Sequence, residues 1–110
     1  MDNRKAMDIS VQELKDRLDS GSAPKIIDVR EAWEYEQDHI QAENIPMGEV
    51  PERLEELQPY REVELVICCR SGGRSGNIAN FLRANGFSHV RNLTGGMLAW
   101  KAQIDPNFNV

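Results

Sequence analysis

The chain has 110 residues, a length that allows one compact domain and leaves no room for a second core. Of these residues 40% are hydrophobic and 28% are charged, which is typical of a soluble globular protein and excludes a disordered chain. The formal net charge is −5 and no cluster of Lys or Arg is present, which argues against a nucleic-acid-binding surface. We therefore expect a single domain over residues 1–110.

The charges are unevenly distributed along the chain. Residues 31–64 contain eleven acidic and two basic side chains, whereas residues 65–110 contain one acidic and five basic ones. A basic C-terminal part is suited to holding a small anion.

The two cysteines are adjacent, at Cys68 and Cys69, and no other cysteine is available to pair with them. Neighbouring cysteines cannot form the long-range bridges of a secreted disulfide framework, so reduced thiols are expected. Residues 1–10 are polar, and no apolar stretch is long enough for a signal segment or a membrane span. These features predict a cytoplasmic protein without a membrane partner.

The first part of the chain predicts two helices and a strand. Ser10 begins a capping-box pattern over residues 10–13, and the helix that follows ends at Gly21. Its inward face consists of Val11, Leu14 and Leu18. Residues 25–29 form a short apolar run of strand type, and residues 31–39 predict an acidic helix.

The middle of the chain continues with an extended piece at residues 44–46 and a further helix. Pro51 suits the first turn of that helix, and Pro59 closes it. Its buried stripe consists of Leu54 and Leu57.

The last part of the chain predicts two strands and two helices. Residues 65–67 form the most apolar strand, and a helix runs from Ser75 to Asn85 with Gly86 as its C-cap. Its inward residues are Ile78, Phe81 and Leu82. A strand at 90–93 and a helix from Gly96 complete the chain. This alternation predicts a parallel sheet covered by helices on both faces.

The residues most suited to chemistry lie between the strand at 65–67 and the helix after it, at the edge where open parallel sheets bind ligands. They are Cys69, Arg70, Ser71, Gly72, Gly73, Arg74 and Ser75. Two glycines let the backbone amides point inward, the helix start adds its own amides, and two arginines supply charge. Such a nest stabilises an anion, here the sulfur of Cys69.

This arrangement makes Cys69 the candidate nucleophile and residues 70–75 the candidate substrate-binding residues. A helix N-terminus alone contributes about 0.3–1 kcal/mol, which is less than one pKa unit. The loop amides and Arg74 must therefore contribute to ionisation of the thiol. Cys68 is interpreted as a core thiol, since free cysteine is commonly buried.

The remaining polar and aromatic candidates have structural interpretations. Asp28, Arg30 and Glu34 are interpreted as an ion pair and a cap that support the sheet edge. His39 and His89 are isolated, without the spacing of a metal site or a catalytic triad, and are expected to have hydrogen-bonding or surface roles. The tryptophans, Trp33 and Trp100, are expected to fill the core.

The cysteine loop resembles the active-site loop of single-domain rhodaneses, a family of sulfurtransferases. The resemblance extends to residues 28–30, Glu34, 39–40, 44–46, 93–97 and 99–100. It implies an α/β, rhodanese-like fold in which a five-stranded parallel sheet has helices on both faces. It also implies a Cys69 persulfide that takes a sulfane sulfur from thiosulfate or another persulfide and gives it to a thiol, cyanide or a protein, with no metal or organic cofactor.

Two alternatives remain open at this stage. Phosphatases and arsenate reductases with related loops place five residues between Cys and Arg, which is the spacing between Cys68 and Arg74. Only four residues separate Cys69 from Arg74, and this tighter ring suits one sulfur atom rather than a phosphoryl group. The second alternative is a non-catalytic binding module with the same fold. Because side chains alternate along a strand, the identity of the cysteine that faces the loop distinguishes the two spacings.

Overall fold

A computed structural model describes residues 7–110 of the protein. The prediction that the chain begins without a signal segment falls largely on residues 1–6, which lie outside the described residues. From residue 7 onward, no helix combines the length and the apolar character needed to cross a membrane.

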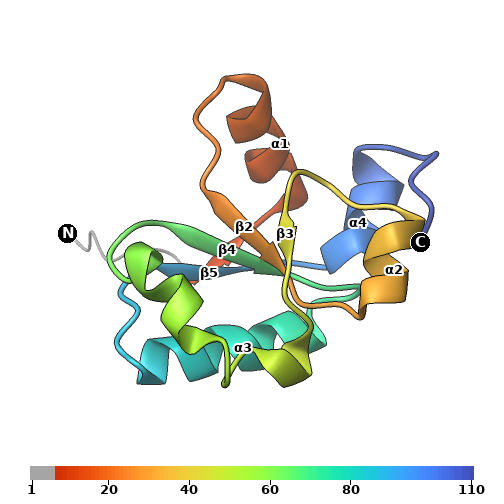
Figure 1. Ribbon diagram of the computed structural model, residues 1–110. Coiled ribbons are helices and arrows are strands. Elements are labelled where there is room, and N and C mark those ends of the chain that lie inside the picture. Colours follow the sequence, from red (N-terminus) through yellow and green to blue (C-terminus); the bar gives the residue numbers. More distant parts are fainter. Residues whose placement is uncertain (1–6) are drawn as a thin grey trace.

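Five strands form one parallel sheet in the order β1-β5-β4-β2-β3 (Figure 1). The strands are β1 (Asp8–Ile9), β2 (Lys25–Asp28), β3 (Glu43–Asn44), β4 (Leu65–Cys68) and β5 (Val90–Leu93). The central strand β4 pairs with β2 on one side and with β5 on the other. The sheet confirms the five-stranded α/β fold, although β1 was not apparent in the sequence pattern.

Helices cover both faces of this sheet. They are α1 (Val11–Asp19), α2 (Ala32–Gln37), α3 (Gly73–Ala84) and α4 (Gly96–Gln103), together with the 3₁₀ helices η1 (Met47–Glu49) and η2 (Leu54–Tyr60). In Figure 1, α3 lies on one side of the sheet, and α1 and α4 lie on the other. Each side has its own cluster of buried apolar residues, as expected for a parallel sheet covered on both faces.

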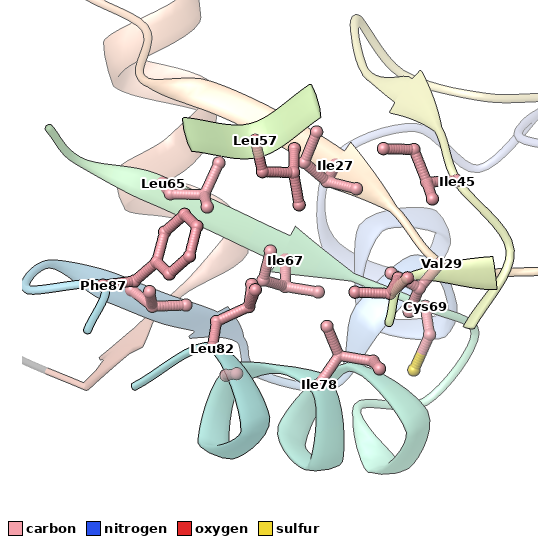
Figure 2. Packing of buried hydrophobic residues seen from close by; sticks show 13 residues of the cluster. Ile27, Val29, Ile45, Leu57, Leu65, Ile67, Cys69, Ile78, Leu82 and Phe87 are labelled. Carbon is pink, nitrogen blue, oxygen red and sulfur yellow. The ribbon is translucent and has the colours of Figure 1, made fainter. Parts of the chain in front are cut away.

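The strand β4 sends alternate side chains into these two clusters. Val66 and Cys68 belong to the cluster under α1 and α4, whereas Ile67 and Cys69 belong to the cluster under α3. Figure 2 shows Cys69 in the cluster under α3, at the end of the sheet and with its sulfur toward α3. The two adjacent cysteines therefore lie on opposite faces of the sheet.

The helix predicted from Pro51 to Pro59 is not formed: residues 51–53 are a turn, and the 3₁₀ helix η2 follows over Leu54–Tyr60. Pro59 lies inside η2 instead of closing a helix, and an α-helix there would lose a backbone hydrogen bond and clash with its own preceding turn. Leu57 is buried as predicted, but Leu54 is only partly buried.

The starts of two helices also differ from prediction. At α1, the Ser10 hydroxyl accepts from the Glu13 amide at 3.0 Å, which confirms the cap. The Glu13 carboxylate, however, binds Arg91 instead of completing a capping box. The helix α3 begins at Gly73, two residues earlier than predicted, because Gly72 adopts a φ of 108° and caps it.

The prediction for the tryptophans is confirmed for Trp100 and wrong for Trp33. Trp100 is 6% exposed, whereas Trp33 is 65% exposed. The short helix α2 turns the side chain of Glu34 inward, where it binds Arg74, and the preceding residue Trp33 consequently points outward.

Candidate functional site

The loop of residues 69–75, called the cysteine loop below, connects β4 to α3 and surrounds the sulfur of Cys69 with donors. The Gly72 amide lies 3.1 Å from Sγ, and the Ser75 amide lies 3.4 Å from it. The Ser75 hydroxyl lies 3.3 Å from Sγ. The Ser75 amide, in the first turn of α3 where amides lack a partner within the helix, therefore points toward the sulfur together with the Gly72 amide of the loop.

These contacts change the acidity of the two thiols in opposite directions. Burial opposes ionisation of Cys69, but hydrogen bonds from the Ser75 hydroxyl and from the amides of Ser75, Gly72 and Ser71 outweigh it and lower the pKa of the thiol. Burial raises the pKa of Cys68 well above its usual range, and the nearby Asp28 carboxylate raises it further. The thiolate is therefore favoured at Cys69 and disfavoured at Cys68.

Asn92, on the neighbouring strand β5, holds the cysteine loop in place. Its side-chain amide donates to the Gly72 carbonyl at 3.2 Å, and its oxygen lies 2.5 Å from the Ser75 hydroxyl, whose single proton is shared between Asn92 and the Cys69 sulfur. Asn92 thus fixes two of the residues that donate to the sulfur. No role for Asn92 was predicted from the sequence, although Asn is depleted in strands and its presence in β5 is a signal.

The N-terminal end of α4 supports the same loop from the other side. The Met97 amide donates to the Cys69 carbonyl, and the Leu98 amide donates to the Arg70 carbonyl, both at 2.9 Å. Gly96 has a φ of 57°, and a β-carbon at this position would lie 2.4 Å from the Cys69 carbonyl oxygen. Only a glycine therefore allows α4 to approach the loop this closely.

The two arginines of the cysteine loop have different surroundings. Arg74 forms a bidentate ion pair with Glu34, at 2.7 and 3.0 Å, and this pair lowers the pKa of the Glu34 carboxyl. Glu34 also accepts from the Glu31 amide and thereby caps α2, as the sequence predicted. Arg70 is exposed, and its side chain has no hydrogen-bond or ion-pair partner in the part of the chain that the structure describes.

The ion pair predicted beside the loop is present and buried. Arg30 contacts Asp28 at 2.8 Å, and the two side chains are 2% and 0% exposed. Arg30 also donates to the Asp38 carbonyl, so the pair holds the segment that follows α2. The positions of these residues agree with a supporting role at the sheet edge.

The histidines lie apart from the donors to the Cys69 sulfur. His39 is exposed, stacks on Tyr35 with ring centroids 3.8 Å apart, and contacts the Tyr35 carbonyl through Nδ1. His89 precedes β5, and its carbonyl accepts from the Leu65 amide. Within residues 7–110, no group of three or more His, Cys, Asp or Glu side chains is placed to hold a metal ion.

The parallel α/β sheet, whose central strand leads into a loop around a cysteine sulfur, has the fold of rhodanese-like proteins: the rhodanese-like domain protein of Staphylococcus aureus superimposes with a TM-score of 0.78 at 31% identity, covering 96% of this chain and 98% of that one. Residues 10–103 match the family model for the rhodanese-like domain, and the chain belongs to that family.

The relatives of the chain include sulfurtransferases of similar length. The chain is 40% identical over 100 residues to YtwF of Bacillus subtilis, which is provisionally named a sulfurtransferase. The match covers 90% of this chain and 94% of YtwF. The human single-domain sulfurtransferase TSTD1 superimposes with a TM-score of 0.76 at 31% identity, covering 89% of this chain and 97% of the human one. These similarities support a transferase of the rhodanese type.

Some relatives are longer than this chain. YrkF of Bacillus subtilis, provisionally named a sulfur carrier protein, is 37% identical over 99 residues, and the match covers 89% of this chain but 52% of YrkF. The same domain therefore also occurs as part of larger proteins.

Proposed function

We propose that the protein transfers a sulfane sulfur through a persulfide on Cys69, with thiosulfate or another anionic sulfur donor as the source. The observation that carries this proposal is the ring of donors around Sγ, three of which lie within 3.4 Å. Donors that surround one atom stabilise a thiolate before the reaction and the sulfur anion of the persulfide after it. In this role Cys69 is the nucleophile, and Arg70, Ser71, Gly72, Gly73, Arg74 and Ser75 bind the substrate.

The first half-reaction is a displacement at sulfur. The Cys69 thiolate attacks the outer sulfur of thiosulfate, a new S–S bond forms, and the bond to the sulfonate sulfur breaks. Sulfite leaves with the electron pair of that bond, so no external oxidant, reductant or metal is needed. The exposed Arg70 guanidinium is available for the sulfonate oxygens, while Arg74 holds Glu34 and adds positive charge near the sulfur.

The second half-reaction returns the sulfur to an acceptor and regenerates the thiolate. We propose that the acceptor is a thiol, cyanide or a protein. A cycle of this kind requires a reduced Cys69 at every turnover, and both cysteines are free. The reducing cytoplasm is therefore the proposed compartment.

The spacing of a phosphatase loop is disfavoured by the geometry. That spacing requires Cys68 as nucleophile, but its side chain belongs to the cluster on the opposite face, and burial raises its pKa. The ring around Cys69 has the tighter spacing, and we expect no turnover of an aryl phosphate. Phosphatase activity that disappears in Cys68→Ser would contradict this assignment.

The mass of the intact protein after incubation with thiosulfate tests the proposed function directly. We expect the wild-type protein and Cys68→Ser to gain one sulfur atom, and Cys69→Ser to gain none. Sulfur transfer from thiosulfate to cyanide should follow the same order, with Cys68→Ser retaining most of the activity. No gain in mass for the wild-type protein would favour a non-catalytic binding module. Equal loss of sulfur transfer in Cys68→Ser and Cys69→Ser would contradict the assignment of Cys69 as the nucleophile.

A further inference from the structure

A largely exposed tryptophan lies next to the cysteine loop. Trp33 is 65% exposed, whereas most large apolar side chains between residues 7 and 110 are buried. It borders a pocket of about 260 Å³. The pocket is lined by Arg30, Trp33, Glu34, Gln37, Arg70 and Val110. Because Arg70 directly follows Cys69, this pocket adjoins the loop that carries the sulfur.

The pocket side chains that have no partner within residues 7–110 supply hydrogen-bond donors, and Gln37 also carries an acceptor oxygen. Of the three charged side chains in the lining, Glu34 is neutralised by Arg74 and Arg30 by Asp28. Arg70 is left without an ion-pair partner, and the side chains of Trp33 and Gln37 form no hydrogen bond with another residue of the 7–110 range. A guanidinium, an indole N–H and an amide NH₂ together favour an anionic, planar acceptor of hydrogen bonds such as a carboxylate.

The volume of the pocket limits the length of the ligand that it can hold. Its volume is below the roughly 300–1,000 Å³ of most small-molecule sites, so it suits a short ligand. The face of an exposed indole adds a surface on which a short aliphatic chain packs. A ligand that fills the pocket and also reaches the Cys69 persulfide must carry its sulfur a few bonds from its carboxylate.

We infer that this pocket, formed by Trp33, Gln37 and Arg70, binds the sulfur acceptor, and that the acceptor is a small thiol bearing a carboxylate. This inference rests on the proposed function and names the substrate of its second half-reaction. The acceptor thiolate attacks the outer sulfur of the persulfide, a new S–S bond forms, and the bond to Cys69 Sγ breaks. Cys69 leaves as the thiolate with the electron pair, and the product is a persulfide of the small thiol.

The same arginine then serves both half-reactions without conflict. Sulfite leaves before the acceptor binds, so Arg70 contacts the sulfonate first and the carboxylate afterwards. Trp33 and Gln37, in contrast, belong to the acceptor pocket alone, because the compact thiosulfate ion needs only the loop and its arginines. This difference allows the two half-reactions to be separated by substitution.

The experiment measures loading and unloading of Cys69 separately. The protein is loaded with thiosulfate that carries a labelled outer sulfur, freed of small molecules, and mixed with 3-mercaptopropionate or with the neutral 2-mercaptoethanol. We expect the wild-type protein to unload faster into 3-mercaptopropionate. Trp33→Ala and Gln37→Ala should load at the wild-type rate, and Trp33→Ala should lose about tenfold in unloading into 3-mercaptopropionate while remaining within about twofold with 2-mercaptoethanol.

Two further variants complete the comparison. Trp33→Phe keeps an aromatic surface but loses the N–H, and we expect an intermediate rate with 3-mercaptopropionate. Val63→Ala removes apolar surface from another exposed position, 49% exposed, and should unload both thiols at wild-type rates.

Each other outcome has a defined meaning. Wild-type rates in Trp33→Ala, or equal losses with both thiols, would overturn the acceptor pocket while leaving the persulfide cycle intact. A loaded wild-type protein that shows no preference for the carboxylate thiol, or that unloads only into a polypeptide, would also overturn it. Failure of the wild-type protein to load would instead contradict the proposed function itself.

Discussion

At the scale of single residues, the acidity of Cys69 is decided by competition between burial and hydrogen bonding. The side chain is almost completely inaccessible, which alone would favour the neutral thiol. The donors around Sγ reverse this preference, and the largest opposing contribution comes from the Ser75 hydroxyl. Its importance follows from position, since Ser75 is itself fully buried and is held by Asn92.

Replacing Ser75 by alanine should therefore raise the pKa of Cys69. The amide donors remain in this variant. Because amides do not titrate, the thiol should still ionise in a single step. The rate of alkylation by iodoacetamide as a function of pH measures the midpoint. Ser71→Ala is the matched control, because Ser71 acts through its backbone amide alone, and its midpoint should equal that of the wild-type protein. A profile with two ionisations would mean that an imidazole shares the site.

At the scale of elements, the cysteine loop depends on close contact between secondary structures that are distant in the sequence. Asn92 on β5 and the first turn of α4 both bind loop carbonyls. The Glu34–Arg74 pair joins α2 to α3. The loop is consequently fixed from three directions, which lets its amides point at the sulfur before any substrate arrives.

The substitution Gly96→Ala should disturb this contact. Its β-carbon would lie 2.4 Å from one loop carbonyl oxygen and 2.6 Å from the next, at a backbone φ of 57° that disfavours side chains. We expect a loss of about 2–3 kcal/mol in the free energy of unfolding, together with slower persulfide formation. Gly48→Ala is the control, because no atom lies within 4 Å of its added carbon. Urea denaturation of both variants, combined with the thiosulfate loading rate, checks this expectation. Equal stability of the two variants would show that α4 can move away from the loop without cost.

At the scale of the whole molecule, a cluster of ion pairs joins the first helix, the central strand and β5 far from the cysteine loop. Glu64, just before β4, binds Arg17 of α1 at 2.6 Å and Arg91 of β5 at 2.9 Å. Hydrogen bonding to Arg17 is the main cause that lowers the pKa of Glu64, to about 2. The cluster connects residues 17, 64 and 91 across one face of the sheet.

This shift predicts how stability depends on pH. Because the pKa of Glu64 is depressed in the folded state, its stabilising contribution is complete above the unfolded value of about 4.5 and is lost as pH falls toward 2. At neutral pH the contribution is on the order of 3 kcal/mol. Glu64→Gln should therefore unfold more easily at pH 7 and lose less stability between pH 4.5 and 2 than the wild-type protein. Urea titrations across this pH range measure the effect.

The exposed Glu62 provides the control for this prediction. Glu62→Gln changes the net charge of the protein by the same amount as Glu64→Gln. Its stability and its pH dependence should match those of the wild-type protein. If Glu62→Gln and Glu64→Gln behaved alike, general charge rather than the ion-pair cluster would account for the effect.

The sequence by itself determined the alternation of strands and helices, the position of the cysteine loop and the use of its backbone amides as donors. These properties depend on local patterns: apolar runs, glycines and a helix start directly after a strand. The sequence could not reveal β1, because a strand of two residues carries no periodic signal and is defined only by pairing with β5.

The tertiary structure alone decided which groups complete the site. Glu34 and Arg74 are forty positions apart, and nothing in their neighbourhoods indicates that they pair. Trp33 was expected in the core because tryptophan is apolar, but the orientation of α2 is set by the inward side chain of Glu34, which places the indole in solvent beside Arg70. Local propensities fix what each segment becomes, whereas the packing of segments against one another fixes which side chains meet.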